Sequence, residues 1–272
     1  MKKLKRYQYE RYAVLCKLAY PKTFDHVELG FSEHGHVAIK NRQGHVLARI
    51  LWQEKKKEVI VVFRGSQVLS DWLTNLCCFP KRKRFGNIVY YIHYGYDRLL
   101  NQKVAGAEPE DEALSIYQQI EKVLAPLIAN GKRISLTGHS SGGAMAILTA
   151  DWLERRFDTP VRRVVTFGQP STGFRSFNKH YTLHRRTYRI CCDLDIITFL
   201  PPLPGIFKHV GRNLWLHNER IYENIRPSVR LYKTLTSWLI SPISYHYMHK
   251  YIRNKDFLTS TRRCIIPFHV NK

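Results

Sequence analysis

The sequence predicts an α/β fold, in which a mostly parallel central sheet carries helices on both faces. Short apolar runs recur along the chain, and each ends in a polar or glycine-rich loop. Stretches with helical spacing of apolar residues separate these runs, as expected when parallel strands are joined by helices. The 272 residues contain no internal repeat, low-complexity tract or Pro/Gly/Ser linker, so one domain over residues 1–272 is predicted.

The first part of the chain predicts a helix, a hairpin and a buried strand. Residues 7–20 place apolar side chains at helical spacing. Residues 36–51 alternate weakly between apolar and polar side chains, which predicts a hairpin around Asn41–Gly44. Residues 58–65 form an unbroken run of β-branched and apolar side chains that stops at a glycine, as is typical of a strand buried on both faces.

The middle of the chain predicts further alternation of helices and strands. Residues 110–129 place their apolar side chains on one helical face, and residues 133–137 form the next strand. A helix follows over residues 144–157, and two more strands are predicted over 163–168 and 187–192. Because sites in such sheets gather at the carboxyl ends of the strands, we expect the functional residues in the loops that follow them.

The loop after the strand at 133–137 contains a candidate nucleophile. Gly138–Gly142 matches the pattern G-x-S-x-G, with Ser140 at its centre. A sharp turn from strand to helix would expose the Ser140 Oγ, and the helix N-terminus would direct backbone N–H groups at developing negative charge. The alternative is a glycine-rich turn whose serine caps the helix. The strand, turn and helix together favour the nucleophile.

A serine needs a base to remove its proton, and the base needs a carboxylate to orient it. Asp193 and Asp195 both follow the strand at 187–192, and Asp193, nearer the strand, is expected to cap backbone groups. The histidines downstream of these residues are His209, His217, His246, His249 and His269. The residues alone leave His209 and His246 open as the base.

Seven short blocks follow one another in a recognisable order between about residues 58 and 251. They are Val61–Ser66, Asp71–Leu76, His93–Tyr96, Gly138–Gly143, Phe167–Pro170, Asp195–Pro202 and His246–Tyr251. In these blocks the chain resembles the class 3 lipases, the fungal-type family of α/β-hydrolases. One departure is Thr198, which stands where the family usually has proline.

The resemblance implies a complete catalytic triad. It favours Asp195 over Asp193 as the acid and His246 over His209 as the base, with Ser140 as the nucleophile. In such a triad the acid fixes the tautomer of the histidine, which takes the serine proton. The reaction then needs no metal ion and no cofactor.

The same resemblance implies an oxyanion hole and a lid. The hole is expected to consist of the backbone N–H of Ser141 together with the N–H and hydroxyl of Ser66. Residues 69–79 are apolar and aromatic, and by resemblance they form a short lid over an acyl pocket. The alternative for this segment is an ordinary buried helix.

The charge of the chain predicts an anionic partner. Lys and Arg number 44 against 21 Asp and Glu, for a formal net charge of +23. Hydrophobic residues at 44% exclude a disordered polycation. The basic residues cluster at 2–6, 55–57 and 81–84, and the last cluster follows the predicted lid. No helix-turn-helix, RNP or zinc-finger pattern is present, so an anionic membrane surface is expected rather than nucleic acid.

The cysteines and the apolar runs bear on localisation. The six cysteines show no C-x-x-C spacing, which favours buried thiols in a reducing compartment. The basic start is not followed by an apolar core, so no secretion signal is expected. The least charged run, residues 134–150, is too short to cross a bilayer. These features predict a cytoplasmic protein or one bound peripherally to a membrane.

The sequence therefore predicts a serine hydrolase that cleaves carboxylic esters of lipids through an acyl-enzyme on Ser140. Triacylglycerols and phospholipids are both candidate substrates. The alternative hypothesis is a protein without catalytic activity that binds anionic lipid or another polyanion on a lipase-like scaffold. A fluorophosphonate probe that labels Ser140 would separate these two functions.

Overall fold

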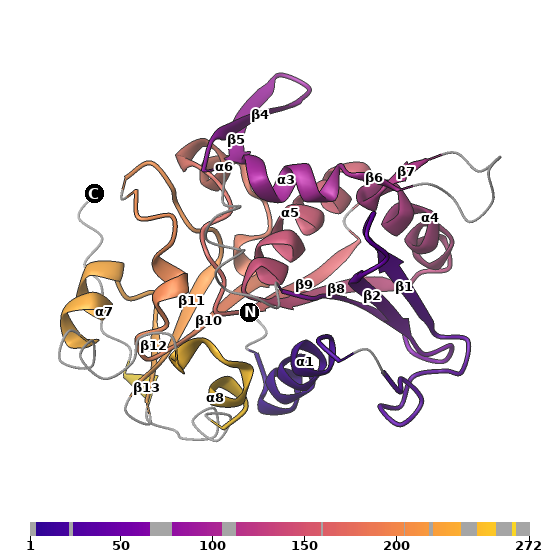
Figure 1. The fold of residues 1–272 in the computed structure, drawn as a ribbon, viewed down its shortest axis with the longest axis horizontal. Helices are drawn as coiled ribbons and strands as arrows, with labels where there is room; N and C mark the ends of the chain where they lie inside the picture. The colour runs from indigo at the N-terminus through magenta and orange to yellow at the C-terminus, as the bar shows by residue number, and fades with distance from the viewer. Residues whose placement is uncertain are drawn as a thin grey trace.

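The computed structural model describes most of the chain. The described residues are 4–21, 24–65, 78–104, 113–158, 160–203, 205–217, 220–234, 244–253 and 263–264. Within them the fold is a nine-stranded sheet with helices on both faces, as the sequence predicts (Figure 1).

Five parallel strands form the centre of the sheet. In spatial order they are β3 (Glu58–Phe63), β8 (Arg133–His139), β9 (Val161–Phe167), β10 (Thr187–Cys192) and β11 (Arg212–His217). The predicted strands at 58–65, 133–137, 163–168 and 187–192 are thus all present, with ends that differ by at most two residues. Their carboxyl ends lie at one edge, where the sequence places the candidate site residues.

Antiparallel strands flank this centre. The predicted hairpin forms β1 (His36–Lys40) and β2 (Val46–Trp52), and β2 pairs antiparallel with β3. On the other side β12 (Arg220–Glu223) runs antiparallel to β11, and β13 (Arg263–Cys264) pairs with β12.

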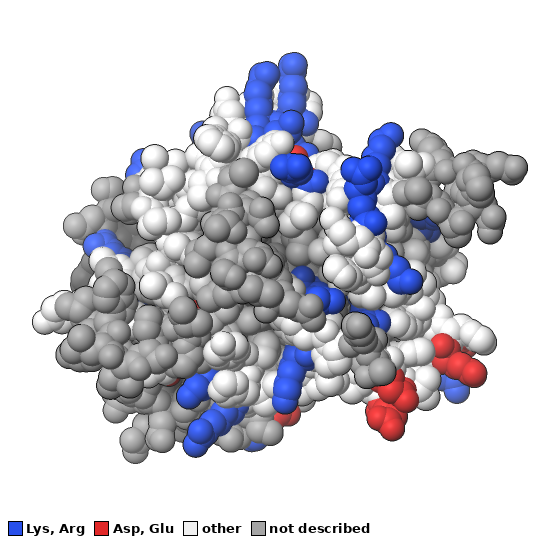
Figure 2. Space-filling model, viewed as in Figure 1, with Lys and Arg blue, Asp and Glu red and all other residues white. Residues whose placement is uncertain are grey.

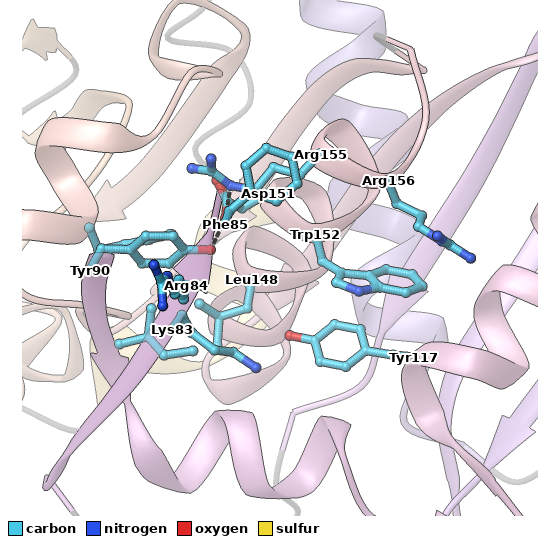
Figure 3. Close-up of a pocket in the computed structure, with 12 residues that line it drawn as sticks. Lys83, Arg84, Phe85, Tyr90, Tyr117, Leu148, Asp151, Trp152, Arg155 and Arg156 are labelled. Carbon is cyan, nitrogen blue, oxygen red and sulfur yellow. Dashed lines mark hydrogen bonds and ion pairs between the residues drawn. The ribbon is translucent and has the colours of Figure 1, made fainter. Parts of the chain in front are cut away.

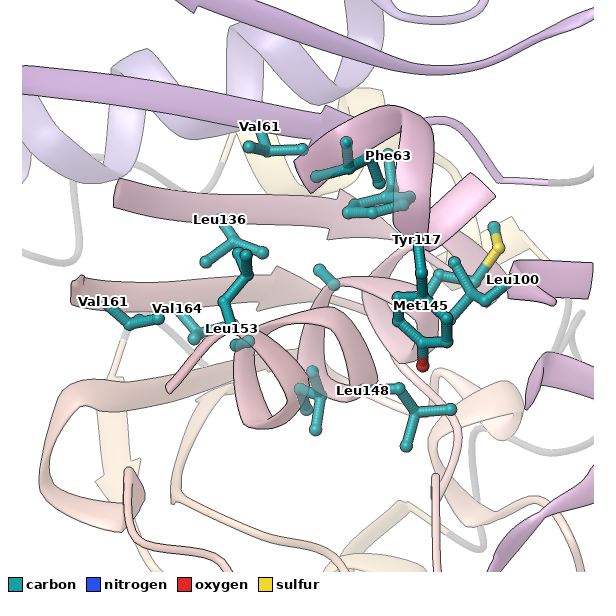
Figure 4. Close-up of a cluster of buried hydrophobic side chains, with 14 of the residues drawn as sticks. Val61, Phe63, Leu100, Tyr117, Leu136, Met145, Leu148, Leu153, Val161 and Val164 are labelled. Atoms are coloured by element: carbon teal, nitrogen blue, oxygen red, sulfur yellow. The ribbon is translucent and has the colours of Figure 1, made fainter. Parts of the chain in front are cut away.

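One face of the sheet is covered by four helices. They are α3 (Tyr94–Leu100), α4 (Ile116–Ala129), α5 (Ser141–Arg156) and α6 (Arg175–His180). Side chains from β3 and from the neighbouring strands pack against α5, together with Leu100 of α3 and Tyr117 of α4 (Figure 4). Val61 and Phe63 point to this face, as alternate residues of a strand must.

The other face is covered by the first helix of the chain and a helix near its end. These are α1 (Arg6–Leu18), which the sequence predicts at 7–20, and α8 (Met248–Arg253). Ile60 and Val62 of β3 point to this side and pack in the same cluster as α1. Because the central strands are buried on both faces, they appear in the sequence as continuous apolar runs.

The remaining elements lie around this framework. They are the hairpin β4 (Pro80–Phe85)–β5 (Ile88–His93), the pair β6 (Lys103–Val104)–β7 (Leu114–Ser115), the helix α7 (Pro227–Thr234) and the short helices η1 (His184–Arg186), η2 (Ile196–Phe199) and η4 (Ser244–His246). The β4–β5 hairpin projects from the body of the molecule, and Lys and Arg side chains gather at that end (Figures 1 and 2).

Two predicted helices begin at different residues in the structure. The helix predicted from residue 110 begins at Ile116, because Ser115 and Gln118 form a reciprocal capping box at that point. The helix predicted from residue 144 begins at Ser141, immediately after the turn that holds Ser140.

The basic run at 81–84 lies on the exposed strand β4. Within the described part of the chain, no helix is both long and apolar enough to span a bilayer.

Candidate active site

Ser140 occupies a strained turn between β8 and α5. Its backbone has φ 58° and ψ −131°, a conformation that L-residues rarely adopt, and it directly precedes the first residue of the helix. The Ser140 N–H donates to the carbonyl of Phe167 at 2.9 Å, and the Ser140 carbonyl accepts from Gly143 at 3.0 Å. These bonds fix the turn from both sides, as a serine nucleophile requires.

Glycines are needed around this turn because the backbones approach closely. A Cβ on Gly138 would lie 2.4 Å from the backbone of Gly142, and one on Gly142 would lie 2.5 Å from the Phe63 carbonyl. A Cβ on Gly65 would lie 3.3 Å from the Cβ of Ser140, so the end of β3 passes beside the candidate nucleophile. The strand, glycine turn and helix predicted around Ser140 are therefore present.

Asp195 and His246 are brought together from segments 51 residues apart. The His246 Nδ1 lies 2.9 Å from Oδ1 of Asp195 and 3.0 Å from its Oδ2. Both side chains are buried. Since a carboxylate can only accept, the His246 Nδ1 carries the hydrogen, and its Nε2 has no hydrogen-bond partner among the described residues. That nitrogen can accept a proton.

Tyr251 completes the surroundings of the carboxylate. Its hydroxyl donates to the Oδ2 of Asp195 and accepts from the Cys192 N–H at 3.3 Å. The Ile197 N–H donates to the Oδ1 of Asp195 at 3.1 Å. Tyr251 lies in the family block His246–Tyr251, but the sequence alone indicates no role for it. Only the fold shows that α8 carries it back to the end of β10.

The environment keeps the Asp195 carboxylate charged. Burial alone would raise the pKa of Asp195, but the charge of His246 and the hydrogen bonds from His246 and Tyr251 lower it below its usual value. Burial and the nearby Asp195 charge raise the pKa of Tyr251, so its hydroxyl stays a donor. The pair therefore holds a negative charge where an imidazolium would form.

His139, beside Ser140, supports the segment that carries His246. Its Nε2 lies 2.6 Å from the His246 carbonyl oxygen, and its Nδ1 lies 2.8 Å from the Tyr20 hydroxyl. Because a carbonyl can only accept, Nε2 carries the hydrogen and Nδ1 accepts from Tyr20. Burial, followed by the charge of His246, lowers the pKa of His139 to about 3, so this ring stays neutral. Its plane lies against the His246 ring, with centroids 4.4 Å apart.

The rejected candidates occupy other positions. Asp193 was expected to cap backbone groups, but its Oδ1 instead lies 3.0 Å from the Nδ1 of His217. His209 reaches the Thr198 carbonyl with its Nε2 at 2.9 Å and makes no contact with Asp195 in the described hydrogen bonds. Thr198, at the unusual position in the family block, accepts a hydrogen bond from Arg230 at 2.7 Å.

Parts of the predicted site lie outside the described residues. They include Ser66 of the expected oxyanion hole and most of the predicted lid, residues 69–77. Ser141 is described and lies buried in the first turn of α5. Among the described residues no group of three His, Cys, Asp or Glu side chains is placed to hold a metal ion. Cys16, Cys78, Cys191 and Cys192 form no disulfide, so the adjacent pair at 191–192 is not bridged.

A family model described as Lipase (class 3) matches residues 60–205. A lipase of Rhizomucor miehei is 26% identical over 176 residues, which cover 60% of this chain and 43% of the relative. A secreted mono- and diacylglycerol lipase of Malassezia restricta is 33% identical over 104 residues, 38% of this chain and 34% of the relative. The matches therefore span less than half of the length of these curated relatives.

Solved structures share the fold. A triacylglycerol lipase whose catalytic centre is described as a serine protease triad superposes with a TM-score of 0.58 at 21% identity, covering 78% of this chain and 80% of that one. A propeptide complex of the Rhizomucor miehei lipase gives a TM-score of 0.57 at 22% identity, over 77% of this chain and 68% of the other. At these identities the likeness is one of fold.

Proposed function

Because the chain belongs to the class 3 lipase family, we propose that it hydrolyses carboxylic esters of lipids through an acyl-enzyme on Ser140. The observation that carries this proposal is the buried pair of Asp195 and His246, whose ring lies 4.4 Å, centre to centre, from the ring of His139, the residue before the strained turn at Ser140. Esters of acylglycerols and phospholipids are the candidate substrates.

The first half of the reaction forms the acyl-enzyme. The Ser140 Oγ attacks the ester carbonyl carbon while its proton passes to the Nε2 of His246. Asp195 stabilises the imidazolium that results. The tetrahedral intermediate then collapses, the bond to the alcohol oxygen breaks, and His246 returns its proton to that oxygen as the alcohol leaves.

The second half regenerates the enzyme. Water gives a proton to His246 while its oxygen attacks the acyl carbon. Collapse then breaks the bond to the Ser140 Oγ, His246 returns the proton to that oxygen, and the acid is released. The negative charge on the carbonyl oxygen would be stabilised by hydrogen bonds from the Ser141 N–H at the start of α5 and from the N–H and hydroxyl of Ser66. Each donor of this kind contributes about 10²–10³ in rate.

The test is a panel of p-nitrophenyl esters of graded chain length, together with triacylglycerol and zwitterionic and anionic phospholipids. Ser140→Ala and His246→Gln should reduce turnover to background, by about 10⁴-fold or more. Ser171→Ala and His209→Gln are matched controls, since both residues are outside the proposed triad, and they should keep most of the activity. A fluorophosphonate probe should label the wild type and not Ser140→Ala.

Full activity of Ser140→Ala on a short ester would refute the triad. If the pure wild type neither turned over any ester nor reacted with the probe, a lipid-binding protein without catalytic activity would be the better description. Labelling at a residue other than Ser140 would also count against the proposed mechanism.

The protein is further proposed to act at an anionic membrane surface, to which the β4–β5 hairpin would dock. Residues 78–96 contain no Asp or Glu, while β4 carries four consecutive Lys or Arg residues. Phe79 and Phe85 at the ends of β4 expose 68% and 48% of their surface. Basic and aromatic side chains together are suited to the interface between headgroups and acyl chains.

Co-sedimentation with vesicles tests this docking. We expect binding to phosphatidylcholine vesicles that contain phosphatidylserine, and release of the protein as salt screens the attraction. Vesicles of phosphatidylcholine alone should bind weakly at low salt. Equal binding to both compositions would contradict the electrostatic part of the proposal.

A further inference from the structure

A cavity lies between the β4–β5 hairpin and the second half of α5. Its volume is about 340 Å³, within the range of small-molecule sites. Of its twelve lining residues four are Lys or Arg and one is an acid, so it favours an anion. Figure 3 shows Tyr90 and Arg84 of the hairpin on the left and Trp152 and Arg156 of α5 on the right.

Two of the cations are held firmly in place. The Lys83 Nζ lies 2.7 Å from Oδ1 of Asp97, whose side chain is almost fully buried. The Arg155 Nε donates to Oδ2 of Asp151 at 2.9 Å, and its guanidinium lies 5.0 Å from the centre of the Tyr90 ring. Such cations cost little conformational entropy when they meet a ligand.

The other two cations are at the surface. Arg84 donates to the Gly86 carbonyl of its own turn at 3.1 Å, and no carboxylate pairs with it among the described residues. Arg156 pairs with Glu121 at 2.9 Å, but its side chain is 62% exposed, so this pair is easily exchanged for another anion. Arg84 and Arg156 are therefore the two cations of the cavity that can most readily turn to a ligand.

The walls of the cavity are aromatic and apolar. Tyr117 of α4 and Trp152 of α5 lie with their ring centres 4.8 Å apart and form one wall (Figure 3). Leu148 and Phe177 line the cavity among its apolar residues. A ligand that fits this site combines a negatively charged group with a ring or glycerol unit that can lie against the aromatic side chains.

We propose that this cavity binds the phosphate-bearing headgroup of an anionic membrane lipid. The inference rests on the proposed docking of the hairpin, because strand β4 supplies Lys83 and Arg84 to the cavity and would bring it to the membrane surface. Arg fits phosphate oxygens with paired donors, and a phosphate monoester carries more charge than a phosphodiester headgroup.

The site is separate from the proposed triad. Arg155 lies fifteen residues beyond Ser140 on α5, which at 1.5 Å per residue is roughly 22 Å. Headgroup binding would therefore orient the enzyme on the membrane without touching the reacting ester.

The test uses the Ser140→Ala protein, so that binding is measured without hydrolysis. Phosphatidylcholine vesicles carry either phosphatidic acid, a phosphate monoester, or phosphatidylserine, a phosphodiester, at fractions that give equal surface potential. Arg84→Gln/Arg156→Gln removes two cations of the cavity. Lys81→Gln/Arg82→Gln is the matched control, because it removes two charges from the same hairpin outside the cavity.

The wild-type cavity should favour phosphatidic acid over phosphatidylserine by about tenfold, and only the cavity variant should lose this preference. Equal binding to the two vesicle types, or an equal loss in both double variants, would overturn the proposal. Soluble glycerol 3-phosphate should bind more weakly than the vesicle lipid, and equal affinity would identify a free phosphate compound as the ligand instead.

Ester hydrolysis is measured separately, with Ser140 intact. The cavity variant should turn over a short p-nitrophenyl ester at the wild-type rate. Vesicle selectivity in a protein without esterase activity would refute the proposed function and leave the headgroup site standing.

Discussion

Tyr251 shows how one side chain can hold the acid of the proposed triad in position. Its hydroxyl connects the backbone at Cys192 to the Oδ2 of Asp195, while the Oδ1 of the same carboxylate receives the Ile197 N–H. The carboxylate is thus held on both oxygens before it meets His246. We assign Tyr251 a positioning role, because it acts on the reaction only through Asp195.

We predict that Tyr251→Phe lowers kcat by about tenfold with little change in KM. A hydrogen bond to a charged group contributes about 1.5–3 kcal/mol, part of which the other donors to Asp195 retain. The pKa of Asp195 is lowered partly by this bond, so its loss raises that pKa and the acid limb of the kcat profile moves to higher pH. Steady-state kinetics from pH 4 to 9 measure both effects.

Tyr9→Phe is the control for this variant, since its hydroxyl donates to the backbone carbonyl of Tyr251 and not to the acid. It should affect stability and leave the acid limb unchanged. A Tyr251→Phe enzyme with an unaltered pH profile would show that the tyrosine only packs.

Gly168 is a second residue on which the site depends. Its φ is +56°, and a Cβ there would lie 2.5 Å from Oδ2 of Asp195 and 3.0 Å from Nδ1 of His246. Gly168→Ala should therefore separate the acid from the imidazole and lower kcat by about a hundredfold, the cost of a displacement of about 1 Å. Gly131→Ala is the matched control, because Gly131 has φ +76° with nothing within 4 Å.

Both variants introduce backbone strain of about 1–2 kcal/mol, which thermal unfolding measures. Only Gly168→Ala should lose activity beyond what that strain explains. Comparable kcat values in the two variants would mean that glycine is needed at position 168 only for its backbone conformation, and not for the space beside Asp195 and His246.

Sequence reasoning at the residue scale works where the chemistry is local. Ser140 lies in a short pattern whose glycines and helix follow it directly, so it can be identified from neighbouring residues. Asp195 and His246 are 51 residues apart, so their contact is seen only in the folded chain. From the sequence, these two residues could be chosen only by family resemblance. Tyr251, Tyr20 and Gly168 act across long separations, and nothing next to them in the chain indicates their roles.

At the scale of elements, one ion pair among the described residues joins the β4–β5 hairpin to the body of the protein. Lys83 of β4 meets the buried Asp97 of α3 at 2.7 Å. Lys81, Arg82 and Arg84 on the same strand are exposed, and none of them pairs with a carboxylate within the described part of the chain. The hairpin is thus anchored through its inner face.

We predict that Lys83→Met lowers the free energy of unfolding by about 1–3 kcal/mol, because it leaves the Asp97 carboxylate buried without its partner. Lys81→Met, on the same strand, should change it by less than about 0.5 kcal/mol. Urea denaturation compares the two. In the double variant Lys83→Met/Asp97→Asn most of the lost free energy of unfolding should return. If it does not return, the loss in Lys83→Met has a cause other than the unpaired Asp97 carboxylate.

The hairpin also shows why part of the fold escapes prediction from sequence. Buried strands such as β3 and β10 are continuous apolar runs and can be recognised directly. Strand β4 contains four basic residues, is exposed except at the half-buried Lys83 and pairs with β5 alone among the described strands, so it lacks any apolar period. The predicted start of α4 at residue 110 was too early. The capping box of Ser115 and Gln118 begins the helix at Ile116, and apolar spacing alone does not reveal such a cap.

At the scale of the whole molecule, buried histidines link stability to pH. Burial, followed by the charge of His246, lowers the pKa of His139 from 6.5 to about 3, and burial lowers that of His93 to about 4. Both rings are neutral in the folded protein, whereas the unfolded chain takes up protons near pH 6.5. The contribution of these two rings to the free energy of unfolding is therefore fully present above pH 6.5. It is lost as the pH falls toward 4 for His93 and toward 3 for His139.

We predict a steep fall in the free energy of unfolding between pH 6.5 and 4, with a slope of up to about 1.4 kcal/mol per pH unit for each such group. His93→Asn keeps an acceptor for the Gly95 N–H and removes one titrating ring. The free energy of unfolding of this variant should therefore fall less steeply with pH over this range, by up to about 1.4 kcal/mol per pH unit, the share of one titrating group. Urea midpoints at several pH values measure the slope, and parallel curves would contradict the assignment.

The contact between α1 and α8 has a consequence for the order in which the protein can be built. The Tyr9 hydroxyl bonds to the carbonyl of Tyr251, 242 residues further along the chain, and both helices cover the same face of the sheet. A ribosome adds about 5–20 residues per second, so roughly 12 to 48 s separate the synthesis of the two tyrosines. During that interval α1 is the only described helix that can shield this apolar sheet face, and the contact cannot form until Tyr251, which also bonds to Asp195, has been synthesised.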